Sequence, residues 1–240
     1  MKRYIKKAVK KYFIGSIKKV AKCITGIDFK GQVGQDMLAY MFFRGKKDGF
    51  FIDIGANDGV TINNTIVFEK LWTIIGGGGG VAVEPLPDAF NKLKGNRSCD
   101  CFNVAISHVS GESMEFNKVV GNDFLGGLDE QMTEEHKKRI IDNNLNIEKI
   151  YVKTLTFDDL MSNYPERRHI DFMSIDVEGA EMSILKAIDF SKFTFGLITI
   201  ENNENDGGKK LIRFMDEHGY KVYINLCCDI MFIPKRKYIN

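Results

Sequence analysis

An apolar segment that runs directly into a glycine-spaced turn constrains the fold of this chain most. Residues 50–54 are apolar apart from Asp53, and Gly55 and Gly59 follow in the turn. A continuous apolar run of this length is typical of a strand buried on both faces of a parallel sheet. A second apolar segment, residues 172–175, ends in a cluster of carboxylates. We therefore expect two strands of one parallel sheet, each with polar groups at its carboxyl end.

The remainder of the chain alternates strand-like and helix-like segments. Further strands are expected at residues 81–83, 101–106, 113–119, 149–155, 197–200, 220–226 and 229–233. Helices are expected at residues 35–43, 63–72, 87–94, 129–142, 156–163, 180–188 and 208–218. This order predicts a doubly wound α/β sheet that ends in an antiparallel hairpin. Residues 107–155 break the alternation and are expected to form an insertion that covers the sheet edge.

Charge is divided unevenly along the chain. The 240 residues include 34 Lys or Arg and 32 Asp or Glu, which gives a net charge of +2. Residues 1–22 carry nine of the basic residues and no acidic one, so the other 218 residues carry 25 basic and 32 acidic groups. The acidic remainder argues against a nucleic-acid partner. The length suits one large domain with small additions.

The basic N-terminal segment has the spacing of an amphipathic helix. Its apolar residues are Ile5, Val9, Phe13, Ile14, Ile17, Val20 and Ala21. Such a helix either packs its apolar stripe on the domain or lies on an anionic membrane surface, which predicts peripheral membrane contact through residues 1–22. The segment lacks the apolar core of a signal peptide, and no apolar run in the chain is long enough to span a bilayer.

The cysteines and a run of glycines carry weaker signals. Five cysteines, at positions 23, 99, 101, 227 and 228, form neither a disulfide framework nor a paired zinc motif, which favours reduced thiols and a cytoplasmic protein. Five consecutive glycines occupy residues 76–80. They are interpreted as a flexible connector or, alternatively, as a phosphate cradle, although no G-K-[ST] follows them.

The turn after the first expected strand is a candidate cofactor site. Gly55 and Gly59 allow a ligand to approach the backbone closely, and Asn57 lies between them. Glu84 ends the next expected strand, where a carboxylate can accept both hydroxyls of a ribose. Because the spacing is not G-x-G-x-x-G, a nicotinamide dinucleotide is disfavoured. An ordinary strand-to-helix turn is the alternative.

Acidic groups at two later strand ends are candidates for catalysis. Asp176 ends the segment at residues 172–175, and Glu178 follows it before the next helix. Glu201 and Asn202 end the strand expected at residues 197–200. Asp176, Glu201 and Asn202 are all oxygen donors, so they also predict a Mg²⁺ site. The alternatives are helix capping by Glu178 together with Glu181, and a structural hydrogen bond for Asp176.

Several stretches together resemble the FkbM family of S-adenosylmethionine-dependent methyltransferases over about residues 48–203. They are residues 51–59 (FIDIGANDG), 83–85 (VEP), 105–107 (AIS), 154–160 (TLTFDDL) and 175–181 (IDVEGAE). The resemblance implies a class I methyltransferase fold and O-methylation, often of sugars or glycans and sometimes of polyketides. The chain departs from the family in the glycine run before Val81, and the basic N-terminal helix lies outside the resemblance.

The resemblance also implies roles for individual residues. Those implied for the cofactor are Asp53, Gly55 and Asn57 at its methionine side, Glu84 at its ribose, and Asn103 and Ala105 near its adenine. Asp176 matches the strand end where related enzymes such as catechol O-methyltransferase hold their oxygen ligands. We expect Asp176 to act as general base or metal ligand, with Glu201 as the second candidate and Glu178 as the third.

The sequence therefore predicts two regions and one main function. Residues 1–47 are expected to be a basic, amphipathic helical region, and residues 48–240 a methyltransferase domain with the insertion at 107–155. The predicted reaction is O-methylation of a sugar hydroxyl in a bacterial surface glycan or its precursor. A non-catalytic binding module with the same fold and a nicotinamide-dependent oxidoreductase remain the alternatives.

Overall fold

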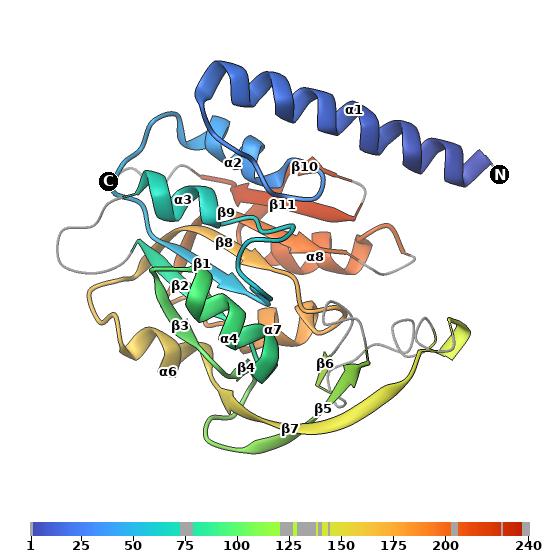
Figure 1. Ribbon diagram of the computed structural model, residues 1–240. Helices are drawn as coiled ribbons and strands as arrows, with labels where there is room; N and C mark the ends of the chain where they lie inside the picture. The colour runs from blue at the N-terminus through green and yellow to red at the C-terminus, as the bar shows by residue number, and fades with distance from the viewer. Residues whose placement is uncertain are drawn as a thin grey trace.

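The computed structural model describes residues 2–72, 79–120, 127–128, 138, 141–143, 145–202, 206–226 and 228–236, with side chains from residue 14 onward. Its main sheet has seven strands, in the order β10 (Tyr220–Asn225), β11 (Asp229–Pro234), β9 (Thr194–Glu201), β8 (His169–Ile175), β1 (Phe51–Ile54), β2 (Gly80–Val83) and β3 (Asp100–Phe102). All neighbours from β9 to β3 pair in parallel, whereas β11 is antiparallel to both β9 and β10. This confirms the predicted doubly wound, class I methyltransferase sheet with its terminal hairpin (Figure 1).

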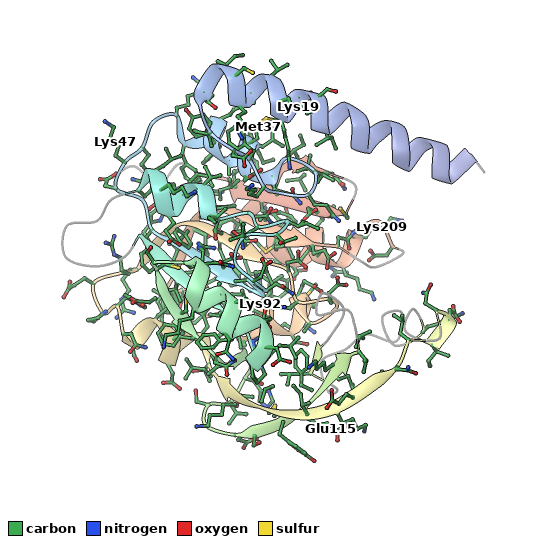
Figure 2. The ribbon with its side chains drawn as sticks, in the orientation of Figure 1. Lys19, Met37, Lys47, Lys92, Glu115 and Lys209 are labelled. Atoms are coloured by element: carbon green, nitrogen blue, oxygen red, sulfur yellow. The ribbon has the colours of Figure 1, made fainter. Side chains whose placement is uncertain are left out.

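Helices cover both faces of this sheet, and side chains fill the space between the layers (Figure 2). One face carries α2 (Gln35–Phe43), α3 (Ile66–Leu71) and α4 (Pro87–Asn96), and the other carries α6 (Phe157–Ser162), α7 (Glu181–Ala187) and α8 (Lys209–Glu217). Within β1, Phe51 packs into the core of the first face, while Ile52 and Ile54 pack into that of the second. Burial on both faces explains why this strand is apolar almost throughout.

A second sheet is built from the inserted residues, in the order β4 (Ala105–Ile106), β7 (Ile147–Leu155), β5 (Ser113–Val119) and β6 (Gly127–Leu128). The prediction of one strand over residues 101–106 was wrong, because β3 and β4 belong to different sheets. Asn103 lies at the break, and its Nδ2 donates to the carbonyls of Glu84 at 2.8 Å and Pro85 at 3.0 Å. Those bonds take the chain out of the main sheet. The helix expected at 129–142 falls largely outside the described residues.

Two further differences have local causes. The helix expected at 63–72 begins only at Ile66, because Asn63 Oδ1 accepts the backbone N–H groups of Thr65 and Ile66 at 2.9 Å each. Of the glycine run, Gly80 is paired with Phe51 in β1, and a Cβ at Gly80 would lie 2.5 Å from the Phe51 ring. Close strand packing therefore requires glycine at that position, whereas residues 76–78 lie outside the described part of the chain.

The N-terminal helix α1 (Lys2–Thr25) lies along one side of the molecule, and its N-terminal end projects beyond the other elements (Figure 1). Its half-buried positions include Ile14, Lys18 and Ala21, which share one helical face. Val20 and Ile24 are exposed by 58% and 78%. At this end of the helix the apolar stripe is therefore divided, because Ile14 and Ala21 are half-buried whereas Val20 and Ile24 face outward. Within the described residues, no helix is both long and apolar enough to cross a membrane.

Candidate active site

The loop after β1 is held against the ends of both neighbouring strands. The backbone N–H groups of Gly55 and Ala56 donate to the carbonyl of Val83 in β2, each at 3.0 Å. On the other side, the Asp176 N–H donates to the Ile54 carbonyl at 3.0 Å. Gly55 has φ +85°, and a Cβ there would lie 1.8 Å from the carbonyl oxygen of Asp176. Only glycine permits this close approach.

Glu84 fixes the shape of the same loop from the end of β2. Its Oε2 accepts the backbone N–H of Asn57 at 2.8 Å, and its Oε1 accepts that of Leu86 at 2.9 Å. Asn57 has φ +50°, a left-handed conformation that non-glycine residues adopt mainly where surrounding contacts impose it. The side chain of Glu84 is buried, and a carboxylate at the end of this strand is of the type that accepts ribose hydroxyls.

A small apolar cavity of about 30 Å³ opens beside this loop. Its walls come from the ends of β1 and β2, from α7 and its preceding loop, and from the second sheet. They include Ile54, Gly55, Val83, Ala105, Phe116 and Ile184. The predicted residues Gly55 and Ala105 thus lie on the cavity, whereas the Asn103 side chain is bonded to the carbonyls after β2. Its apolar lining next to a carboxylate is the kind of surface that a heterocycle joined to a ribose can contact.

Asp53 has different partners from those that the resemblance implies. Its Oδ2 accepts hydrogen bonds from Asn63 at 2.8 Å and from Thr65 at 2.7 Å, and lies 3.7 Å from Nη1 of Arg97. Burial raises the pKa of Asp53, and the charge of Arg97 opposes that rise. These contacts give Asp53 a positioning role, while direct contact with a cofactor stays a prediction.

Arg97 is a residue that sequence reasoning missed. Its guanidinium is fully buried and binds Asp53, Glu69 and the Gly59 carbonyl, the last at 3.2 Å. Gly59 itself is packed tightly, because a Cβ there would lie 2.7 Å from Cγ of Arg97. Arg97 therefore supports the far end of the loop after β1, at Gly59. A single basic residue just after a helix gives no sequence signal of this role.

The carboxylates predicted for catalysis do converge. Asp176 follows β8 and Glu201 ends β9, and both strands point the same way in adjacent positions. Carboxylate oxygens of Asp176, Glu178 and Glu201 lie within 4.8 Å of one another, and all three residues are half-buried. The structure thus brings together the three residues expected to be catalytic. Asn202 was also expected among the metal ligands. Its side chain lies beside Gly208, with Nδ2 3.2 Å from the position that a Cβ of Gly208 would take.

Asp176 and Glu201 share a hydrogen bond, so the pair holds a proton between two carboxyl groups. Burial raises the pKa of Asp176 well above its usual range, and the charges of Glu178 and Asp229 add to the rise. Burial and the charge of Asp176 raise the pKa of Glu201 in the same way. The two carboxyl groups therefore titrate as a pair, in which one member can hold a proton while the other is ionised.

Glu181 holds the loop that presents Asp176. The Glu181 carboxylate accepts the backbone N–H groups of Val177 at 3.3 Å and Gly179 at 2.9 Å. These bonds hold the loop before α7 and are not the helix capping left open for Glu181, since the N-cap residue Ala180 makes no side-chain capping bond. Glu178, between them, has φ +53° and projects toward the pair formed by Asp176 and Glu201. A strained backbone held by several contacts is a common feature of functional sites.

A second element that sequence reasoning missed reaches this cluster from the N-terminal region. Asp229, which begins β11, is the register partner of Glu201 and is buried. Its Oδ2 accepts a 2.8 Å hydrogen bond from Nε2 of Gln35, at the start of α2. Asp229 also contributes to the raised pKa of Asp176. Gln35 thus joins α2 to the sheet edge that carries the carboxylate cluster, through a partner 194 residues away in the sequence.

Comparisons with solved structures find methyltransferases at low similarity. The ribosomal protein L11 methylase of Lactobacillus delbrueckii subsp. bulgaricus is 11% identical, with a TM-score of 0.45 over 85% of this chain and 78% of that one. The precorrin-6y C5,15-methyltransferase of Geobacter metallireducens GS-15 is 13% identical, with a TM-score of 0.41 over 82% of this chain and 86% of that one. Such distant likenesses say nothing about the acceptor.

The comparison with protein families is the informative one. Curated protein sequences give no match. A family model described as the methyltransferase FkbM domain matches residues 53–222, which is well over half of the chain and runs from β1 into β10. The matched residues contain the glycine loop, Glu84 and the carboxylate cluster. On this match, the chain belongs to the FkbM family of methyltransferases.

Proposed function

We propose that this protein is an S-adenosylmethionine-dependent O-methyltransferase that acts on a sugar hydroxyl of a bacterial surface glycan or its precursor. The observation that carries the proposal is the hydrogen-bonded pair of Asp176 and Glu201 beside the glycine loop. An oxygen nucleophile must lose a proton on methylation, and this pair offers one carboxylate to receive it. The family membership supports methyl transfer and leaves the acceptor to experiment.

The residues beside β1 and β2 fit S-adenosylmethionine. The apolar cavity, lined in part by Val83 and Ala105, would contact the adenine. Glu84, at the end of β2, would accept the ribose hydroxyls. The backbone at Gly55 and Asn57 would face the methionine part. The glycine at position 55 leaves a cradle that any side chain would fill.

The chemistry divides between the cofactor and the chain. When bound, S-adenosylmethionine supplies an electrophilic methyl group. The chain has to hold the acceptor hydroxyl in line and to take up its proton. Asp176 accepts that proton, and Glu201, whose carboxylate lies within 4.8 Å of it, supports the Asp176 carboxylate. General-base assistance of this kind typically contributes about 10²- to 10⁴-fold to the rate.

Replacement of the base tests this assignment. We expect Asp176→Asn to lower methyl transfer about 10²- to 10⁴-fold while the affinity for S-adenosylmethionine stays within about twofold. Transfer is measured as release of S-adenosylhomocysteine with a panel of nucleotide sugars, and affinity by calorimetry. Glu166→Gln, on an exposed carboxylate, is the matched control. Equal losses of affinity and turnover would remove Asp176 from the base role, and transfer only to nitrogen nucleophiles would overturn O-methylation.

Mg²⁺ remains a second proposal for the same carboxylates. The converging oxygens of Asp176, Glu178 and Glu201 are of the type that Mg²⁺ prefers, and a bound ion would lower the pKa of the acceptor hydroxyl. Chelation with EDTA distinguishes the two mechanisms. Activity that is lost in EDTA and restored by MgCl₂ would establish the ion. Activity that survives EDTA would favour proton transfer to Asp176 alone.

We also propose that the protein works in the cytoplasm and has no nucleic-acid partner. Support comes from its thiols, because Cys23, Cys99, Cys101 and Cys228 are all free. A reducing compartment keeps cysteines in that state. The predominance of acidic residues after residue 22 supports the absence of a nucleic-acid partner. Fractionation of cells and a nucleic-acid-binding assay at physiological salt test the two statements.

A further inference from the structure

The part of α1 whose side chains the structure describes, residues 14–25, exposes an apolar surface that no other described element covers. Ile17, Val20 and Ile24 are exposed by 37%, 58% and 78%, and their spacing places them on one side of the helix. Together with Ser16 and Ala21 they line a shallow, almost wholly apolar hollow. Apolar residues grouped in this way on a surface mark an interaction site more often than scattered single ones.

The helix is held with this side directed outward. Ile14 and Lys18 are half-buried residues of another side, and Nζ of Lys18 donates to the Gly31 carbonyl in the segment that follows the helix. Lys22 forms a 3.0 Å ion pair with Asp28 in that same segment. These contacts fix the rotation of α1 about its axis. The apolar side is therefore a stable outer surface of the folded protein.

We propose that α1 docks this protein on a membrane surface rich in anionic lipids. Residues 1–22 carry nine basic side chains and no acidic one, so the helix combines an apolar side with a high positive charge. That combination matches a bilayer interface, where apolar side chains enter the headgroup region and lysines meet lipid phosphates. A second copy of α1 is a poor partner, because it would bring two such charges together.

Vesicle binding tests the docking. The full chain should sediment with vesicles of phosphatidylcholine and phosphatidylglycerol, much less with phosphatidylcholine alone, and less as salt is raised. Val20→Ser/Ile24→Ser and Lys19→Glu should each weaken binding to the anionic vesicles at least tenfold, because they remove apolar contact and reverse a charge. Calorimetry with S-adenosylmethionine should show unchanged affinity in both variants, which confirms that they fold.

The control lies on the opposite side of the molecule. Tyr151 in β7 is exposed by 69% and is the register partner of Glu115, which Figure 2 shows far from Lys19. Tyr151→Ser should bind the anionic vesicles as the unaltered protein does. A loss in Tyr151→Ser equal to that in the α1 variants would overturn the proposal, as would absence of vesicle binding. Dimerisation in solution that the double variant abolishes, without vesicle binding, would assign the surface to a second copy instead.

Discussion

At the scale of single residues, one contact joins the two halves of the site. Gly55 belongs to the loop beside the apolar cavity, and Asp176 is the proposed base. The position of a Cβ at Gly55 lies 1.8 Å from the Asp176 carbonyl oxygen, so the two backbones touch there. Gly55 also has φ +85°, which side chains other than glycine rarely adopt. Steric fit and backbone conformation therefore both require glycine.

We expect Gly55→Ala to weaken S-adenosylmethionine binding at least tenfold and to lower the free energy of unfolding by roughly 2–4 kcal/mol, because the β8 loop must move away. Calorimetry and urea denaturation measure the two effects. Gly111→Ala is the matched control, since Gly111 has φ +80° and no atom within 4 Å of its Cβ position. It should cost only about 1 kcal/mol, the strain of the left-handed conformation. Similar losses in both variants would show that the contact with Asp176 is unimportant.

The residues of the site differ in how far the sequence reveals them. Asp176 and Glu201 were predictable, because parallel strands place their carboxyl ends on one edge and each residue ends an apolar run. Arg97 and Gln35 were not, because each acts through a partner far away in the sequence. Arg97 meets Glu69 across 28 residues, and Gln35 meets Asp229 across 194. Such pairings follow from tertiary packing and leave no local pattern.

At the scale of elements, α3 and the end of α4 are joined to β1 by buried charges. Arg97, just after α4, pairs with Glu69 of α3 and Asp53 of β1. Burial alone would raise the pKa of Glu69, but the charge and hydrogen bond of Arg97 outweigh it and the net pKa is lowered. The folded state therefore favours the ionised form of Glu69. This pairing stabilises the fold only while Glu69 remains ionised.

The sign of the pH dependence follows from that lowered pKa. The contribution of Glu69 is fully present above its ordinary pKa of 4.5 and is lost as the pH falls through the lower, folded-state value. Glu69→Gln should lower the free energy of unfolding by about 1–3 kcal/mol at pH 7, and the difference from the unaltered protein should shrink toward pH 3. Urea denaturation across this range measures it. A loss of unfolding free energy in Glu69→Gln that does not depend on pH would contradict the assignment. Glu166→Gln, at an exposed carboxylate, should leave the free energy of unfolding unchanged.

At the scale of the whole molecule, helix α2 of the N-terminal region packs on the domain core. Residues before 53 lie outside the family match, yet α2 packs directly on the main sheet. The ring of Phe43 meets those of Phe68, Trp72 and Phe172, with centroids 5.8, 5.1 and 6.3 Å away. The helix at 35–43 was predictable from its apolar residues, but its place on the sheet was not. The proposed boundary at residue 47 remains a prediction.

Truncation of one side chain measures this packing. We expect Phe43→Ala to lower the free energy of unfolding by about 2–4 kcal/mol, because it leaves a cavity among three aromatic rings. Met41→Ala, on the same helix and exposed by 59%, should change it by no more than about 0.5 kcal/mol. Denaturation in urea compares the two. Equal, small effects would show that α2 is an appendage with little influence on the core.

The touching backbones of Gly55 and Asp176 have a consequence for altering the substrate range. Because these backbones touch, we expect substitutions in residues 177–180, on the proposed acceptor side, also to change how tightly the methyl donor is held. Kinetic constants for the two substrates will then vary together across a library of such variants. Substitutions at Gln35 act from α2 and leave that contact alone. Engineering for a new acceptor is therefore best begun from the N-terminal side.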